Sequence, residues 1–499
     1  MDVSPDESGT IKVNGSAAAF YPSVSNITLY STVFLEAIPA IGYAFSGWSG
    51  NVTGTANPTS LIVDCDKAVT ATFTPLSPKL YFPHVASQGG NSADIWETEV
   101  CLINTSDQVL SGVLRSYRHN GQAVSSGKAI TLAAHERWSR IVGGGQFTNP
   151  AAIGYMVFES ASDRVVGYTK FYKEGIQRTA IPAVREVNTS NIYIPHVASD
   201  AQWRTELILV NTTSAPVEEL IITFNNGENR QFSLDAGEHR AFDIAGLFDN
   251  QPQPDIQSAV ITNANGIIGV ELFGRTDDRQ LDGILLTGKA ASTVYYPHVA
   301  GGEWWTGIAA YNPSELPCTI TITPYDAQGT LLTRLTSSIE GKERYIGVVP
   351  ELGLPAETAW FKIYSPQQRL SGFELFGTVD GNQLAAFAGG GAIGAKAGIF
   401  PKIEENGWTG IALVNTEATA ASVTLTAYKD NGAPVATRVL PVSGHAKVVD
   451  LAENIFFPQD IGGATYIAYA SNRNVVGFQL NGSADEMMLD GLPALGGAN

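Results

Sequence analysis

Polar and apolar residues alternate along most of the chain with a period of two, which is typical of β-strands. In the segment 205–211 one face carries Thr, Leu, Leu and Asn, and a similar face recurs in 98–104 and 409–415. The opposite face is also largely apolar, so we expect a central strand that is covered on both sides. The segment 319–323 alternates strictly between Thr and Ile and leads into the hairpin-type turn 326–329. Helical patterns are scarce and predict only single turns, at 244–248 and 348–352.

The second feature is an internal repeat. The phrase Tyr-x-Pro-His-Val-Ala occurs at 81–86, 193–198 and 295–300, and in weakened form at 399–403. A glycine opens a later strand of each copy, and it recurs with the same period of roughly 100 residues, longer than a solenoid unit. We therefore predict four tandem domains, named copies 1 to 4, at 77–190, 191–292, 293–396 and 397–499. About seven strands per copy favour a Greek-key (Ig-like) β-sandwich, with a closed barrel as the alternative.

Residues 1–76 follow a different pattern. The segment 42–50 reads Gly-Tyr-Ala-Phe-Ser-Gly-Trp-Ser-Gly, Ala-Ile-Pro precedes it at 37–39, and Asn-Pro and Val-Thr-Ala-Thr-Phe follow at 57–58 and 69–73. This wording resembles the divergent internalin-B-type repeat of bacterial surface proteins. The resemblance implies a small β-grasp-like module at the N-terminal end of an otherwise sandwich-type, all-β chain.

The four copies, in turn, are similar to tandem sandwich domains of uncharacterised secreted proteins of Gram-negative bacteria. This similarity rests on the wording Pro-His-Val-Ala, Trp-x-Thr and Asn that the copies share. Together the two resemblances imply an extracellular or cell-surface location. Residues 75–78 and the glycine run 389–391 are expected to be linkers.

The composition of the chain limits the classes of partner that it can bind. The 499 residues include 48 acidic and 30 basic ones, a net charge of −18, which argues against nucleic acid or an anionic membrane as partner. Apolar residues make up 44% of the chain, enough to bury cores. No stretch approaches the ~20 apolar residues that span a bilayer, so we expect no membrane insertion. No secretory signal is visible, and we expect such a signal to lie outside this chain.

The three cysteines, Cys65, Cys101 and Cys318, are widely separated. Their odd, sparse number excludes a disulfide framework and a cysteine-rich zinc site, and buried thiols are expected.

The repeated histidines are the first candidate for chemistry. One lies in the Pro-His-Val-Ala phrase of each of the first three copies (His84, His196 and His298), and Lys402 replaces it in copy 4. Imidazole is a common metal ligand, but a charged lysine is not. We therefore favour a strand-end histidine that hydrogen-bonds backbone across an interdomain hinge, and predict no metal site; a metal or another ligand is the alternative.

Tryptophans are the second candidate. Five of them cluster just ahead of the same strand in the four copies: Trp96, Trp203, Trp304, Trp305 and Trp408. A flat aromatic surface suits the apolar side of a sugar ring, so these residues are the candidate ligand-binding set. The alternative is a plug in the core or between domains.

The acidic residues give only weak indications of a calcium site or a catalytic pair. Acidic loops at 277–282, around Asp380 and at 485–490 lack the spacing of a calcium loop and are expected to be solvated hairpins. Glu271 and Glu374 share one register, but Thr and Gln occupy it in the other copies, so a paired-carboxylate glycosidase is not indicated. We found no hydrolase, phosphate-binding or metalloprotease motif, and we predict neither catalytic residues nor a cofactor.

These features favour a non-catalytic extracellular or cell-surface protein that acts as a stalk, adhesin arm or filament component. Repetition would let weak contacts add up to useful avidity. The alternatives are an array of polysaccharide-binding modules and an accessory region of a secreted enzyme. The partner classes are a glycan, another surface protein, or further copies of this chain joined through exposed sheet edges.

Overall fold

The computed structural model describes residues 1–5, 8–17, 21–40, 43–75, 78–86, 96–389 and 394–496. The protein is all-β, as predicted. Helical structure in these ranges is limited to α1 (Ala452–Phe456) and three short turns, η1 (Pro150–Ala152), η2 (Ala245–Phe248) and η3 (Val349–Leu352). Two of the turns fall where the sequence predicted them. The linker positions 76, 77, 390 and 391 lie outside the described residues, and Gly389 ends a strand.

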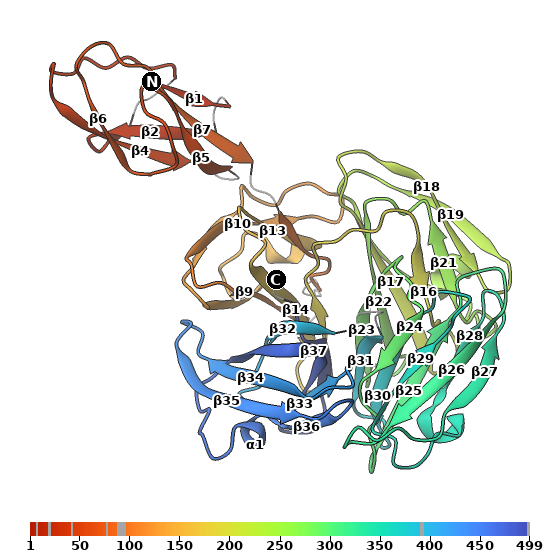
Figure 1. Ribbon diagram of the computed structural model, residues 1–499. Coiled ribbons are helices and arrows are strands. Elements are labelled where there is room, and N and C mark those ends of the chain that lie inside the picture. The colour runs from red at the N-terminus through yellow and green to blue at the C-terminus, as the bar shows by residue number, and fades with distance from the viewer. Residues whose placement is uncertain are drawn as a thin grey trace.

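The N-terminal module projects from the rest of the chain (Figure 1). It has two sheets, ordered β1-β7-β5 and β3-β2-β4-β6, and β1 pairs with β7 in parallel. Trp48 and Phe73 are buried between the sheets, and Cys65 is exposed rather than buried as expected. Its strands are β1 (Asp2–Ser4), β2 (Gly9–Val13), β3 (Ser16–Ala17), β4 (Thr32–Pro39), β5 (Tyr43–Gly50), β6 (Thr59–Ile62) and β7 (Val69–Pro75).

Copies 1 to 3 share one topology of two four-stranded sheets. In copy 1 the outer sheet has the order β11-β10-β13-β8 and the inner sheet β12-β9-β14-β15, and the chain crosses repeatedly between them. The described part of copy 1 thus contains eight strands, where about seven were expected. The strands of copy 1 are β8 (Lys79–Phe82), β9 (Glu97–Asn104), β10 (Leu110–Tyr117), β11 (Lys128–Leu132), β12 (Arg137–Ile141), β13 (Tyr155–Ser160), β14 (Val165–Lys173) and β15 (Gln177–Pro182).

The equivalent strands follow in the same order in the next two copies. Those of copy 2 are β16 (Ile192–Ile194), β17 (Trp203–Asn211), β18 (Val217–Phe224), β19 (Asn229–Leu234), β20 (His239–Asp243), β21 (Ala259–Thr262), β22 (Ile267–Arg275) and β23 (Leu281–Leu286). Those of copy 3 are β24 (Thr293–Tyr296), β25 (Trp304–Tyr311), β26 (Cys318–Tyr325), β27 (Leu335–Ile339), β28 (Arg344–Val348), β29 (Trp360–Tyr364), β30 (Ser371–Thr378) and β31 (Leu384–Gly389).

Copy 4 departs from this plan at one strand. Its strand β37 (Tyr466–Ser483) is continuous and pairs with β34 and with β33, so it serves both sheets where the other copies use two strands. The other strands are β32 (Ala395–Phe400), β33 (Gly407–Asn415), β34 (Ala421–Tyr428), β35 (Pro434–Val442), β36 (Lys447–Leu451) and β38 (Leu489–Pro493).

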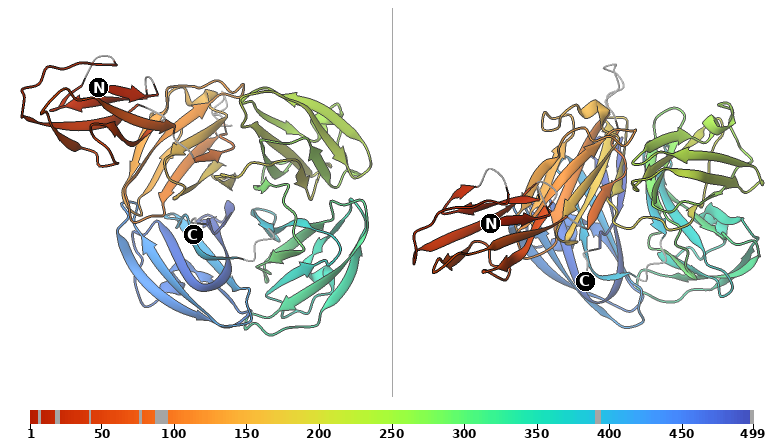
Figure 2. Two further views of the ribbon diagram at one scale, coloured as in Figure 1. Left: turned by 45° about the horizontal axis from the view of Figure 1, so that its top comes forward. Right: turned by 90° about the horizontal axis from the view of Figure 1, so that it is seen from above.

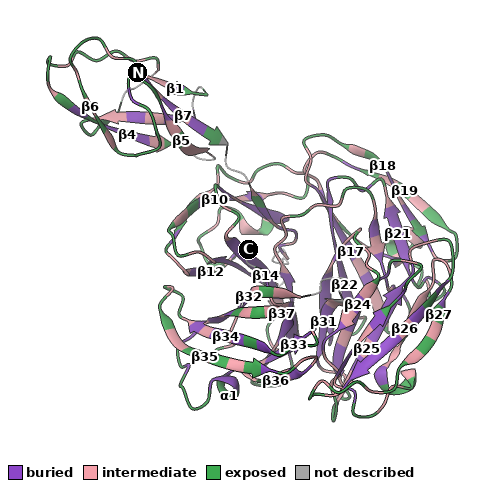
Figure 3. Cartoon of the chain, in the orientation of Figure 1, coloured by how far each residue is buried: buried purple, intermediate pink, exposed green. Residues whose placement is uncertain are grey.

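The four copies close into a ring around a common centre (Figure 2). Their last strands lie at the centre, where β15 contacts β23, β23 contacts β31, β31 contacts β38, and β38 returns to β15. Copy 1 therefore touches copy 4, far away in sequence. The strands nearest the centre are largely buried, whereas the outer strands carry most of the exposed residues (Figure 3).

Ring closure explains why the central strand of each copy is apolar on both faces. In β17, Leu207 and Leu209 lie in the core of copy 2. On the other face, Ile208 packs against Phe171 of copy 1, and Val210 against Tyr155. The second face is therefore an interface between copies.

Candidate functional site: the junctions of the ring

Neighbouring copies meet through equivalent surfaces, which we call the 1–2, 2–3, 3–4 and 4–1 junctions. The open end of one sandwich is covered by the inner sheet of the next. Strand pairing identifies the equivalent positions of the copies. The Thr near the start of the central strand of each copy pairs with one residue of the neighbouring strand: Thr98 with Phe171, Thr205 with Phe273, Thr306 with Phe376, and Thr409 with Asn481.

At the 1–2 junction three histidines form a hydrogen-bonded row. His84 Nδ1 lies 3.1 Å from His239 Nε2, and His239 Nδ1 lies 2.9 Å from His119 Nδ1. Burial lowers the pKa of His84 to about 3 and that of His239 well below its usual value, with the neighbouring histidines adding to the effect. Both rings are therefore neutral near pH 7. Among the described residues, no group of three or more His, Cys, Asp or Glu side chains is arranged to hold a metal.

The next two junctions replace this row with a cation and a carboxylate. His196 hydrogen-bonds Arg344 of copy 3, and His298 hydrogen-bonds Lys447 of copy 4. Each junction also holds a fully buried glutamate, Glu271 or Glu374. Burial raises the pKa of each glutamate well above its usual value, and the nearby Arg344 or Lys447 acts in the opposite direction.

Comparison of the junctions shows that the two sides match each other. Where the next copy presents Arg344 or Lys447, the preceding copy presents a glutamate. Where it presents the neutral His239, the equivalent position is Thr169. Since a buried charge is costly without a counter-charge nearby, this matching keeps the 1–2, 2–3 and 3–4 junctions close to neutral. At the 4–1 junction copy 1 presents Arg137, and the equivalent position of copy 4 is Gln479. The repeated histidines reach from one copy to the next, as predicted, but their partners are side chains of the next copy and not backbone groups.

Aromatic stacking fills the middle of two junctions. Phe273 stacks on Phe373 at the 2–3 junction, with ring centroids 5.0 Å apart, and Phe376 stacks on Phe478 at the 3–4 junction, at 5.4 Å. At the 4–1 junction Asn481 stands in the place of the first ring.

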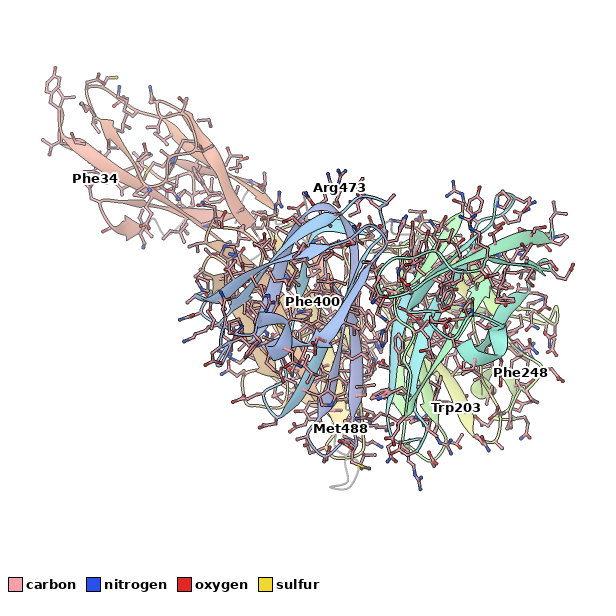
Figure 4. The ribbon with its side chains drawn as sticks, turned by 60° about the horizontal axis from the view of Figure 1, so that its bottom comes forward. Phe34, Trp203, Phe248, Phe400, Arg473 and Met488 are labelled. Carbon is pink, nitrogen blue, oxygen red and sulfur yellow. The ribbon has the colours of Figure 1, made fainter. Side chains whose placement is uncertain are left out.

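The five predicted tryptophans are half-buried and lie beside these junctions. They occupy two adjacent registers and so belong to opposite strand faces: Trp96, Trp203 and Trp304 in one, Trp305 and Trp408 in the other. Trp304 and Trp408 meet edge to face across the 3–4 junction, 6.2 Å apart, beside a groove of about 590 Å³. In Figure 4, Trp203 lies at the same edge of the ring as Met488, opposite Arg473.

Two glycines at each of the second-register tryptophans leave room for the indole. A Cβ on Gly482 would come within 2.1 Å of the Trp408 ring, and one on Gly377 within 2.3 Å of the Trp305 ring. Each indole therefore lies against backbone of its own sheet, which covers one of its faces. The tryptophans are distributed over separate junctions and do not line up as one row.

Two carboxylates that were expected in solvated hairpins are instead buried at the ring centre. Asp282 of copy 2 accepts hydrogen bonds from the Thr179 hydroxyl of copy 1 and the Ala386 amide of copy 3. Asp490 of copy 4 lies 2.7 Å from Arg178 of copy 1. Asp282 lies in β23 and Asp490 in β38, two of the strands at the centre of the ring. From there their side chains connect copies that are distant in sequence.

The 4–1 junction contains a polar cleft of about 850 Å³. Glu99 lies at its base, 3.0 Å from Arg137 Nη2 and 3.1 Å from Lys402 Nζ, and it accepts hydrogen bonds from Ser139 and Tyr168. The surrounding cations hold the pKa of Glu99 well below its usual value despite burial. Sequence patterns missed this site, since its residues come from the two ends of the repeat array.

A signal for the cleft was nevertheless present in the repeats. Lys170 stands where the other copies have leucine (Leu272, Leu375 and Leu480). Arg178 also stands where they have leucine (Leu281, Leu384 and Leu489). Glu404 stands where they have alanine (Ala86, Ala198 and Ala300). Three charges that the sandwich does not require thus meet at one junction.

Comparison with known proteins identifies one part of the chain. Residues 1–77 match the family model of the divergent InlB B-repeat domain, which confirms the resemblance predicted for this segment. A comparison with curated proteins found no match. Within the described residues, no helix has the length and apolar character needed to cross a membrane.

Two solved structures are similar to parts of the chain. One is titled "Crystal Structure of Thermotoga maritima 1070"; it is 16% identical, with 21% of this chain and 98% of that chain covered and a TM-score of 0.19. The other is a tetra-tandem repeat from the extending region of a large adhesion protein, 10% identical, with 79% and 93% covered and a TM-score of 0.11. Both TM-scores are low, and neither match carries a functional argument here.

Proposed function

We propose that this chain is a non-catalytic protein of the bacterial cell surface or extracellular space whose four-copy ring is a binding head. The N-terminal module matches a surface-repeat family and supports the location. The observation that carries the proposal is the closed ring itself, with the module projecting from it (Figure 1). A ring holds its four copies in fixed relative positions, so it presents one preorganised surface.

This arrangement refines the three forms that the sequence suggested. A stalk or filament gains length by joining domains end to end, whereas here copy 1 returns to copy 4. The ring therefore fits the tip of an adhesin arm better than its shaft, and the N-terminal module fits a connecting segment. Preorganisation favours binding because little conformational entropy is lost when a partner is engaged.

Surface display can be tested with antibodies raised against the ring. We expect them to label intact, unpermeabilised cells of the source organism, and we expect cells lacking the gene to adhere less to their natural surfaces. Labelling that appears only after lysis would contradict the proposal. Small-angle X-ray scattering of the purified chain should fit the ring; a profile of an extended rod would favour a stalk.

A polysaccharide-binding array is the second candidate. The groove that Trp304 and Trp408 share at the 3–4 junction supports it. If these residues bind sugar, Trp304→Ala should abolish retention on a polysaccharide column without unfolding the chain. Loss of the fold in this variant would instead assign the tryptophan to the interface.

A further inference from the structure

The cleft at the 4–1 junction differs from the other three junctions in what it buries. The other junctions place leucine at the positions of Lys170 and Arg178, and these leucines are part of apolar clusters. At the 4–1 junction the two cations are almost completely buried. Gly407 of copy 4 and Glu97 of copy 1 stand there at the two positions that Trp304 and Trp408 occupy at the 3–4 junction. The 4–1 junction therefore lacks the tryptophans that the 3–4 junction has at these positions.

The largely buried charges at the cleft come close to balancing. They are four cations and three carboxylates: Arg137, Lys170, Arg178 and Lys402, and Glu99, Glu404 and Asp490. The other charged residues of the lining are one cation and five carboxylates: Arg140, Glu174, Glu405, Asp430, Glu453 and Asp460. The wall as a whole therefore disfavours an anion, and its buried part offers little net attraction to an ion of either sign. It does offer donors and acceptors that alternate along one surface.

Part of this wall is not hydrogen-bonded. Glu404 Oε2 is buried and accepts no hydrogen bond from any residue that the structure describes, although Lys170 Nζ and Arg178 Nη2 each lie 3.6 Å from it. Lys170 Nζ lies 3.8 Å from Glu99 Oε2. These distances exceed those of hydrogen bonds, so Glu404 Oε2 and the Lys170 ammonium group have capacity for another partner. Lys170 also has its pKa lowered to about 8 by burial and by the neighbouring Lys402.

We infer that the 4–1 cleft binds a neutral saccharide. A hydroxyl group donates one hydrogen bond and accepts others, so vicinal hydroxyls match a wall on which ammonium and carboxylate groups alternate. The volume of about 850 Å³ lies within the range of small-ligand sites. Tyr172 lines the same cleft and supplies an aromatic surface.

This binding site lies outside the tryptophan set, and it is independent of where the chain is displayed. Failure of the binding test would leave the proposed surface location untouched, and failure of surface labelling would leave the cleft untouched.

The repeats supply the variants for a test. Lys170→Leu and Glu404→Ala each install the residue that equivalent positions carry in the other copies, so the sandwich should accept them. Glu404→Gln keeps the shape and removes only the charge. Glu315→Ala is the matched control, because that carboxylate is highly exposed on copy 3.

The full chain would be applied to a printed array that carries neutral, carboxylated and amine-bearing glycans, and hits would be measured by titration calorimetry. We expect a neutral glycan to bind, with affinity reduced about 10-fold to 100-fold by Lys170→Leu, Glu404→Ala and Glu404→Gln. Glu315→Ala should bind like the unmodified chain. Scattering profiles and thermal unfolding would verify that the variants keep the ring.

Three results would overturn the inference. The first is binding of charged glycans alone, which would mean that the nearly balanced buried charges do not select the ligand. The second is unchanged affinity in folded cleft variants, which would place the site elsewhere. The third is absence of binding to every glycan on the array.

Discussion

The 3–4 and 4–1 junctions are built on equivalent strands but are held together differently. At the 3–4 junction, Phe376 and Phe478 stack and Trp304 meets Trp408, so the contact is mainly apolar. At the 4–1 junction, Asn481 and Lys170 replace apolar residues, and ion pairs surround a cleft. The covalent chain joins copies 3 and 4 directly, but it does not join copy 4 to copy 1. One sandwich surface can therefore form either a mainly apolar joint with a groove beside it or a joint whose ion pairs surround a cleft.

The largest effect on stability is expected at the apolar 3–4 junction. Phe376 is fully buried, and Phe376→Ala should lower the free energy of unfolding by about 3–5 kcal/mol because it leaves a cavity against Phe478. Urea denaturation would measure this loss. Ile346→Ala, at a partly exposed position of the same copy, is the control and should cost far less. A cost below about 1 kcal/mol at Phe376 would mean that the junction contributes little to stability.

The next effect concerns the charge matching. At pH 6.5, below the pKa of about 7 for Lys447, Lys447→Leu removes the cation that faces the buried Glu374. We expect a loss of about 1–3 kcal/mol, because the buried His298 loses its hydrogen-bond partner and Glu374 loses the cation that favours its charged form. The double variant Glu374→Thr with Lys447→His installs the residue types of the 1–2 junction and should recover most of this loss. A double-mutant cycle without coupling would refute the matching.

A smaller effect on stability is expected when the pH is lowered. Burial lowers the pKa of His84 and His196 to about 3, so both remain neutral in the fold, whereas the unfolded chain protonates them near pH 6.5. The stability they contribute is complete above pH 6.5 and is lost as the pH falls from there towards 3.

At pH 5.5 the loss should reach at most about 1.4 kcal/mol per histidine. Stability curves of His84→Asn at pH 7.5 and 5.5 would measure it, because this variant should be less sensitive to acid than the unmodified chain. An equal acid sensitivity in the two proteins would show that His84 titrates normally in the fold.

The smallest effect on stability is expected at the 4–1 junction. The double variant Lys170→Leu with Glu404→Ala should change the free energy of unfolding by less than about 1 kcal/mol, because replacing buried ion pairs by apolar residues is often nearly neutral. Chemical denaturation would measure it beside Phe376→Ala. A loss as large as that of Phe376→Ala would show that the cleft charges exist to close the ring.

Local features of this protein could be predicted from the sequence. The period-two pattern identified strands such as β17 and β26, and the spacing of the repeated phrase identified four similar copies. The Asn that ends the central strand also acts locally, because it caps the following turn; Asn211 accepts a hydrogen bond from the Thr213 amide. These features depend on residues close together in the chain, so local sequence contains the information.

The candidate sites were harder to predict. Asp282 and Asp490 follow tight turns and have the pattern of surface hairpins, yet ring closure buries them between copies. Lys170 and Glu404 are separated by most of the repeat array. Their partners could not be inferred from a single copy; column-by-column comparison of the four copies would have marked them as unusual.

By itself, the sequence determined the all-β class, the fourfold repetition and the identity of the N-terminal module. Each of these follows from alternation and turn chemistry within short segments, or from a recognisable motif. Only the tertiary structure decided that the copies form a ring, which histidine meets which cation, and where a cleft remains. The physical reason is that an apolar strand face must be covered, but its composition does not specify whether the covering surface belongs to the same copy, the next copy or the far end of the chain.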